Sequence, residues 1–204
     1  MSMGKAQKIV TGIAWAAVMV VSVGIVGMAM LVRAGREPAL PVMWDAPEFH
    51  LLDQNGKTVT TTNDLRGRAW IAAFIFTRCA GPCPMMSEKM KELQATIRSP
   101  NVKLVSFTVD PDRDTPQVLK EYAAELGADE SRWTFLTGTP SQMLDVAAGM
   151  KVVAKAATED QPILHSTKFL LVDGNGKVRG AYSYDDVEAI KKLGTDAEVL
   201  ASSE

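Results

Sequence analysis

Beyond residue 40, consecutive apolar residues are concentrated in three short stretches, residues 69–77, 102–110 and 168–173. Runs of this length predict strands buried on both faces of a sheet. Residues 49–61 alternate around Asn55-Gly56, a pattern typical of a β-hairpin. A second turn signal at residues 173–176 follows the last apolar run and predicts that residues 177–183 return beside it.

Helical periodicity appears between these strands. After Cys83-Pro84, one face of a predicted helix carries four apolar residues, Met86, Met90, Leu93 and Ile97. Thr115-Pro116 and Thr139-Pro140 each combine an N-cap residue with a proline suited to the first helical turn. Gln142 completes a capping box with Thr139. Residues 185–194 form a final predicted helix that ends near Gly194.

The order of these elements predicts an α/β domain over residues 45–194, followed by a C-terminal tail over 195–204. Strands first alternate with helices, and the chain then continues as strand, turn, strand and helix. This is the thioredoxin arrangement, in which a central mixed sheet is flanked by helices. Cys79 and Cys83 follow the first buried strand, so they are expected at the carboxyl edge of the sheet, where α/β folds place their sites.

The N-terminal region has a different pattern. Residues 9–32 contain no charged side chain over 24 positions, and at about 1.5 Å per residue they can cross a hydrocarbon core of about 30 Å. We expect an uncleaved transmembrane helix rather than a cleaved signal peptide. Residues 1–8 are then cytoplasmic, 33–44 form a linker, and the soluble domain lies on the outer, periplasmic-type face, where a close cysteine pair can be oxidised.

The distribution of charged residues limits the kinds of partner that the domain can bind. Residues 1–36 hold four basic and no acidic side chains, whereas residues 37–204 hold 18 basic and 24 acidic ones. A mildly acidic domain lacks the basic surface that nucleic-acid binding requires. The sequence therefore predicts no nucleic-acid partner.

Both cysteines of the chain lie in the stretch "TRCAGPCP". A disulfide closing so small a loop would stabilise the fold weakly, so a purely structural role is disfavoured. The start of a helix favours thiolate over thiol, which suits either a redox pair or two soft-metal ligands. Three residues separate Cys79 from Cys83, one more than in most disulfide oxidoreductases of this fold, and the longer loop leaves the sulfurs freer to splay around a metal.

The chain has two histidines that could supply a third metal ligand. His165 lies three residues before the strand that starts at Lys168, and in the predicted fold it faces Cys79 and Cys83. His50 alternates with apolar neighbours in the first hairpin and is interpreted as structural or exposed.

Three motifs, "FTRCAGPCP", "VDPDRDTPQVLKEYA" and "LHSTKFLLVD", occur in this order, and with the N-terminal anchor they resemble the SCO/SenC family over roughly residues 45–185. The resemblance implies copper, Cu(I) or Cu(II), bound by Cys79, Cys83 and His165. It also implies delivery of copper to the CuA-bearing subunit of cytochrome c oxidase, or reduction of that centre's cysteines, with other copper chaperones or thiol oxidoreductases as further partners. Gly81 and Leu164 stand where many relatives carry acidic residues.

Other interpretations stay open or are disfavoured. The same cysteines could serve a membrane-tethered thiol–disulfide oxidoreductase, which does not need His165. A zinc site is not excluded, and a peroxidatic cysteine is disfavoured because Thr77 is too close to Cys79. Asp110, Asp112, Asp114 and Glu121 match calcium-loop positions, but Thr115 replaces the required glycine, so a strand end and helix cap are preferred. The family resemblance implies that Asp110 and Asp114 are scaffolding beside the site. Met86 belongs to the core stripe, whereas Met85 lies off it and could flank the site.

Overall fold

The computed structural model describes residues 40–152 and 167–202, together with residues 4, 15, 18–19, 21–22 and 24. The chain divides into two units, Met1–Ala39 and Leu40–Glu204. Of the first unit, the described residues from 15 to 24 are α-helical. Among the described residues, no helix is both long and apolar enough to cross a membrane. Most of the predicted anchor, residues 9–32, lies outside the described residues.

The second unit is built around one mixed sheet. In the described part of the chain the strand order is β1-β8-β7-β4-β5-β6-β2-β3. The strands are β1 Trp44–Asp45, β2 His50–Asp53, β3 Thr58–Thr60, β4 Ala69–Ile75, β5 Val102–Thr108, β6 Trp133–Thr137, β7 Lys168–Val172 and β8 Lys177–Ser183. The helical elements are a five-residue π-helix at Thr61–Leu65 and the α-helices α2 Cys83–Thr96, α3 Pro116–Leu126, α4 Pro140–Gly149 and α5 Val187–Ser202.

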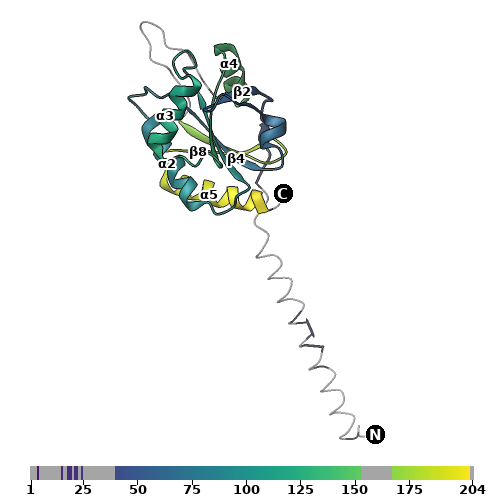
Figure 1. Cartoon of the computed structure of the whole chain (residues 1–204). Helices are drawn as coiled ribbons and strands as arrows, with labels where there is room; N and C mark the ends of the chain where they lie inside the picture. The colour runs from purple at the N-terminus through teal and green to yellow at the C-terminus, as the bar shows by residue number, and fades with distance from the viewer. Residues whose placement is uncertain are drawn as a thin grey trace. The chain divides into compact units, whose positions relative to one another are not determined.

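Strand β4 is buried along its whole length, because helices cover both faces of the sheet (Figure 1). It pairs in parallel with β5 and antiparallel with β7, and β5 pairs in parallel with β6. The side chains of Ile71 and Ile75 join one core with α2, α3 and α5, whereas those of Trp70 and Phe74 join a second core with α4. An apolar residue at every position of β4 is what two such cores require.

The predicted helix starts are confirmed. The hydroxyl of Thr115 accepts a hydrogen bond from the N–H of Val118 at the start of α3. Thr139 and Gln142 form the predicted capping box at the start of α4. Pro82, at the N-cap of α2, makes no side-chain capping bond, so the first N–H groups of α2 beside Cys83 have no side-chain cap from that residue.

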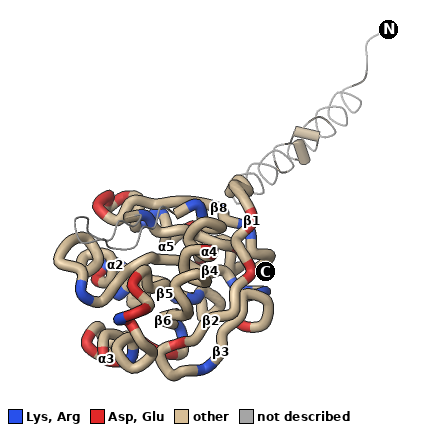
Figure 2. Tube along the Cα trace, turned by 90° about the horizontal axis from the view of Figure 1, so that it is seen from above, with Lys and Arg blue, Asp and Glu red and all other residues tan. Residues whose placement is uncertain are grey.

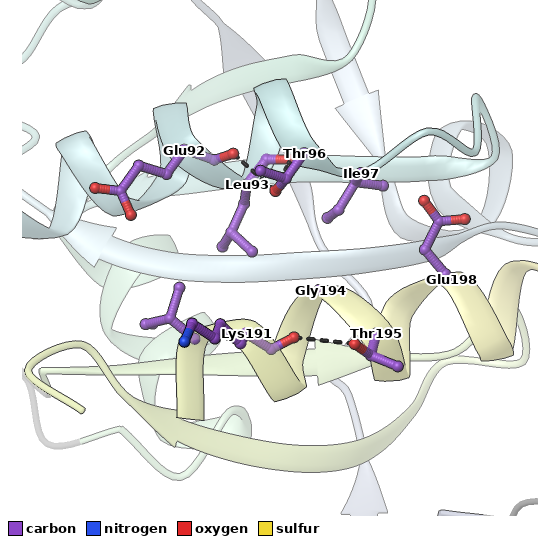
Figure 3. Close-up of a pocket in the computed structure, with 9 residues that line it drawn as sticks. Glu92, Leu93, Thr96, Ile97, Lys191, Gly194, Thr195 and Glu198 are labelled. Carbon is purple, nitrogen blue, oxygen red and sulfur yellow. Dashed lines mark hydrogen bonds between the residues drawn. The ribbon is translucent and has the colours of Figure 1, made fainter. Parts of the chain in front are cut away.

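The predicted end of the last helix is wrong. Helix α5 continues through Gly194 to Ser202, so residues 195–202 are helical rather than a free tail. The cost of a helical glycine is about 1 kcal/mol, and it is outweighed because Ala197, Leu200 and Ala201 are buried beyond it. Figure 3 shows α2 and α5 side by side, with Leu93 pointing toward α5 near Gly194.

The predicted linker also ends earlier than residue 44. Leu40 belongs to the compact unit, where its carbonyl accepts a hydrogen bond of 2.9 Å from Nε of Arg179. Trp44 pairs with Val178 as part of β1. Lys, Arg, Asp and Glu positions are interspersed along the trace of this unit (Figure 2), which agrees with the mixed charge expected from the sequence.

Candidate metal-binding site

Cys79 and Cys83 lie where the central strand β4 leads into α2. Cys83 is the first residue of α2 and is fully buried, whereas Cys79 is half-buried in the preceding loop. The N–H of Cys79 donates to the carbonyl of Phe76 at 3.3 Å, and the N–H of Gly81 donates to the Cys79 sulfur at 3.4 Å. Neither cysteine forms a disulfide. The loop therefore brings two sulfurs together at the carboxyl edge of the sheet.

The two thiols differ in environment. Burial raises the pKa of the Cys83 thiol, and the neighbouring Cys79 side chain raises it further, against an opposing hydrogen bond with the backbone of Phe76. The expectation that the helix start would favour thiolate is therefore wrong for Cys83, because the loss of water on burial outweighs the backbone hydrogen bonds that lower its pKa. A soft cation that binds Cys83 must displace its proton.

The carboxylate of Asp114 fixes the loop that precedes the cysteines. It accepts hydrogen bonds from the hydroxyls of Thr77 and Thr108, each at 2.6 Å, and from the N–H of Thr77 at 3.1 Å. Asp110 binds Arg113 at 3.2 Å. These contacts and the Thr115 cap confirm that the acidic segment is a strand end followed by a helix cap. Asp114 supports the segment that leads to Cys79, whereas a role of Asp110 beside the site stays a prediction. Within the described ranges, no three His, Cys, Asp or Glu side chains form a cluster able to hold a metal ion.

Tyr122 of α3 was not predicted from the sequence as a neighbour of the site. Its hydroxyl lies 2.8 Å from that of Ser87 in α2. Burial raises the pKa of Tyr122, against an opposing hydrogen bond with Ser87. The Tyr122 ring packs against the same buried cluster as Cys79, and Cys83 is a member of that cluster. The signal was available, because Tyr122 continues the apolar face of α3 that carries Leu119.

A groove of about 640 Å³ is lined by Pro84 and Met85, the two residues of α2 that follow Cys83. Tyr122, Tyr184 and Val187 also contribute to its lining. Met85 is 54% exposed there, whereas Met86 is fully buried in the core. The prediction that Met86 belongs to the core is therefore confirmed, and a place for Met85 beside the site stays a prediction.

His165 lies outside the described residues, but the strand that follows it is described. β7 runs antiparallel to β4, with Leu170 opposite Ala72. The amino end of β7, at Lys168, is therefore at the same edge of the sheet as the segment that follows Ile75 and leads to Cys79. His50 lies exposed in β2, as expected.

These features define a class of protein: an α/β domain of thioredoxin-like architecture with a cysteine pair between a central strand and its helix. Comparison with known proteins identifies the family, because the SCO1/SenC family model matches residues 45–196. The chain belongs to the SCO1/SenC family.

Individual relatives agree with this assignment. The SCO1 protein homolog of Bacillus subtilis is 32% identical over 174 residues, which cover 80% of this chain and 90% of the relative. The solved structure of BsSco, described as a member of the Sco family of cytochrome c oxidase assembly proteins with a disulfide switch, matches with a TM-score of 0.70, 31% identity and coverage of 80% and 97%. Arabidopsis thaliana ScoI with copper bound matches with a TM-score of 0.66, 28% identity and coverage of 78% and 99%.

Proposed function

We propose that this protein is a membrane-anchored copper metallochaperone that supplies the CuA centre of cytochrome c oxidase. The observation that carries the proposal is the placement of two cysteines that form no disulfide, Cys79 and Cys83, at the edge of the sheet where β7 also begins. The chain that enters β7 contains His165, three residues before Lys168. A relative with copper bound, Arabidopsis ScoI, supports copper as the cargo.

The chemistry of the three side chains suits copper in both oxidation states. Thiolates are soft ligands that select Cu(I), and imidazole suits Cu(II) as well. Cys79 is the more accessible sulfur and Cys83 the buried one, so Cys79 is the group that an exchanging ligand reaches first. In transfer, a thiol of the acceptor replaces each cysteine on the copper ion. The proton of each acceptor thiol passes to the cysteine thiolate that is released, and the oxidation state of copper does not change.

The partner and location follow from the family and from the sequence. BsSco is described as belonging to a family of oxidase assembly proteins, which supports the CuA-bearing subunit as the acceptor. The charge-free residues 9–32 are proposed as the membrane anchor, with the domain on the outer face. Other copper chaperones or thiol oxidoreductases act as donors of copper or electrons.

A thiol–disulfide oxidoreductase is the second candidate. The two cysteines form no disulfide and are unequal in exposure, as expected for one attacking and one resolving thiol. The description of a disulfide switch in BsSco favours the same chemistry. In this function, oxidation of Cys79 and Cys83 to one disulfide releases two electrons and two protons to a disulfide of the acceptor, and His165 is dispensable.

Anaerobic copper titration of the full chain in mild detergent tests the proposal. His165→Ala is expected to weaken copper binding at least about ten-fold and to change the Cu(II) absorption spectrum. His50→Ala, the matched loss of the other histidine, is expected to change neither. Unchanged affinity and spectrum in His165→Ala would show that the three-ligand site is wrong, and dithiol reductase activity retained in that variant would favour the oxidoreductase.

A further inference from the structure

The groove of about 640 Å³ beside the first turn of α2 is a surface to which the copper chemistry assigns no role. Tyr122 of α3 and Tyr184, between β8 and α5, both line it, and we call it the tyrosine groove. Met85 and Val187 also line it, and they are 54% and 58% exposed. Large apolar side chains that share one hollow and remain this exposed are typical of a site that another molecule covers.

The tyrosine groove adjoins both segments that carry the proposed metal site. Met85, in the first turn of α2, comes two residues after Cys83. On the other side, the N–H of Tyr184 donates to the carbonyl of Thr167 at 3.2 Å, and Thr167 comes two residues after His165 in the chain. A molecule bound in the groove is therefore next to the segments that hold the proposed site.

Acidic side chains outnumber basic ones in the groove. Glu88, Glu92 and Asp185 line it, and Lys89 is the one basic residue among its described lining residues. The ammonium group of Lys89 already binds the carboxylate of Glu92 at 2.8 Å, so Glu88 and Asp185 leave the lining with a net negative charge. Apolar walls with a net negative charge are complementary to an apolar segment that also carries lysine or arginine.

The same charge disfavours two other occupants. A second copy of the chain would bring another acidic domain, since residues 37–204 hold 18 basic and 24 acidic side chains, and the anionic surface of a bilayer would also be repelled. A basic segment of a different protein is attracted instead. Tyrosine and methionine are residue types that are enriched where proteins bind one another, and methionine adapts its shape to the bound surface.

We propose that the tyrosine groove binds a segment of the partner protein that exchanges copper or thiols with Cys79 and Cys83. This segment carries apolar side chains, which cover Met85 and Val187, and at least one lysine or arginine, which lies near Glu88. It is close in sequence to the partner's own cysteine. The inference rests on the proposed function, because it assigns the groove to the partner of the same cysteine pair.

Thiol exchange with synthetic peptides tests the groove in the absence of copper, using the reduced full chain in a nonionic detergent. Each peptide has one cysteine joined by a disulfide to thionitrobenzoate, and the cysteine is flanked by leucine and lysine, by leucine and glutamate, or by serine and lysine. The thiolate of Cys79 attacks the peptide sulfur, and thionitrobenzoate leaves as a coloured thiolate. Cys83 then loses its proton to the buffer and attacks the Cys79 sulfur, and the released peptide thiolate takes up a proton.

The peptide with leucine and lysine is expected to react at least about ten times faster than either of the other two. Each rate is first divided by the rate of the same peptide with mercaptoethanol, a small neutral thiol, which removes differences in intrinsic reactivity. Added salt should reduce the preference over the glutamate peptide. A normalised rate no higher than that of either other peptide would overturn the proposal.

Val187→Ser and Glu88→Gln are the specific variants, because they remove an apolar wall and a negative charge of the groove. Each is expected to slow the reaction of the leucine and lysine peptide about three- to five-fold. Leu144→Ser and Asp145→Asn are the matched controls, since both residues are exposed on α4 and do not line the groove. Equal rates in all four variants would contradict the proposal.

Copper titration of the same variants separates this proposal from the proposed function. Val187→Ser and Glu88→Gln should bind copper as tightly as the unmodified chain, because neither residue is a proposed ligand. A parallel loss of copper affinity would show that the substitutions disturb the cysteines, and the groove would not be a docking surface. If the unmodified chain binds no copper but keeps its peptide preference, the copper proposal fails and the groove proposal stands.

Two further measurements address the other occupants. Light scattering of the unmodified chain and of Val187→Ser should give the same mass, and a dimer that the substitution dissociates would identify a second copy in the groove. The peptide preference should persist when phosphatidylcholine nanodiscs replace the detergent. Its loss there would identify the bilayer as the occupant, and either result would overturn the proposal.

Discussion

The carboxylate of Asp114 accepts two hydrogen bonds from Thr77, one from the N–H at 3.1 Å and one from the hydroxyl at 2.6 Å. The same carboxylate accepts the hydroxyl of Thr108 at 2.6 Å. Thr77 follows β4 and Thr108 ends β5, so one buried carboxylate fastens the two central strands where the loop toward Cys79 departs. Asp114 therefore acts as a structural anchor of the cysteine loop.

Asp114→Ala is expected to lower the free energy of unfolding by about 3 kcal/mol, because three donors lose a charged, buried acceptor. Urea unfolding of the reduced, metal-free protein measures the change. The neighbouring Asp112 is exposed, and Asp112→Ala should stay within about 0.5 kcal/mol of the unmodified chain. Similar losses in the two variants would show that the hydrogen bonds of Asp114 do not stabilise the loop.

The unequal burial of the two thiols predicts unequal reactivity. In the metal-free reduced protein near pH 8, iodoacetamide is expected to modify Cys79 at least about ten times faster than Cys83, because alkylation requires an accessible thiolate. Burial both shields Cys83 and raises its pKa. Peptide mass spectrometry over a time course measures both rates.

The variant Cys79→Ser isolates the buried thiol. Cys83 should remain slow in it, since burial is the largest cause of its raised pKa and the Cys79 side chain is a smaller one. Fast modification of Cys83 in this variant would mean that the start of α2 opens readily. Denaturant should make the two cysteines of the unmodified chain equally reactive.

The sequence predicted the central strands and the helix starts because these features are local. A run of apolar residues indicates a strand that is buried on both faces, and a Thr-Pro pair indicates the start of a helix. Strand β6, Trp133–Thr137, was not predicted, since it is short and includes two threonines. It exists because β5 and β2 pair with its two edges, and those partners are distant in sequence.

The same distinction applies to the site. The spacing of Cys79 and Cys83 and their position before a helix were readable from the sequence. The complete burial of Cys83 was not, because it depends on how α2 packs against the sheet. Nor could the sequence show that Asp114 binds Thr77, since the two residues come from different loops and meet only after β4 and β5 pair.

Replacing a glycine by alanine is expected to change stability in opposite directions at Gly194 and at Gly127. The substitution at Gly194 tests how closely α2 and α5 pack. A Cβ added at Gly194 would lie 3.6 Å from Cδ2 of Leu93, which is ordinary contact. Gly194→Ala is therefore expected to stabilise the protein by about 0.5–1 kcal/mol, by removing the entropy cost of a helical glycine. Thermal unfolding of the two proteins measures the gain.

Gly127 is the matched control for this substitution. It ends α3 with φ of +69°, a conformation that costs a residue with a Cβ about 1 kcal/mol. Gly127→Ala should therefore destabilise the protein although no atom lies within 4 Å of the added Cβ. A loss of stability in Gly194→Ala would show that α2 and α5 pack too tightly at Leu93 to accept a methyl group.

Tyr182 predicts how stability changes at alkaline pH. Its hydroxyl donates to the carboxylate of Asp196, and burial followed by this hydrogen bond raises the pKa of Tyr182 above its ordinary value of 10.0. The unfolded chain therefore loses the tyrosine proton first as the pH rises. Its contribution to stability is complete below pH 10 and declines above it, with a limiting slope of about 1.4 kcal/mol per pH unit.

Tyr182→Phe removes this proton and should flatten the decline above about pH 10. Below that pH the variant should be less stable by about 1–3 kcal/mol, because Asp196 loses a hydrogen-bond donor. Asp196 keeps Lys192 as an ion-pair partner at 2.8 Å, so the variant is expected to fold. Urea midpoints between about pH 8 and pH 11 measure both effects, with the reference pKa of tyrosine setting the range. Burial also raises the pKa of Tyr122, so a smaller slope of stability against pH should remain in the variant. A slope equal to that of the unmodified chain would mean that Tyr182 ionises alike in the folded and unfolded chains.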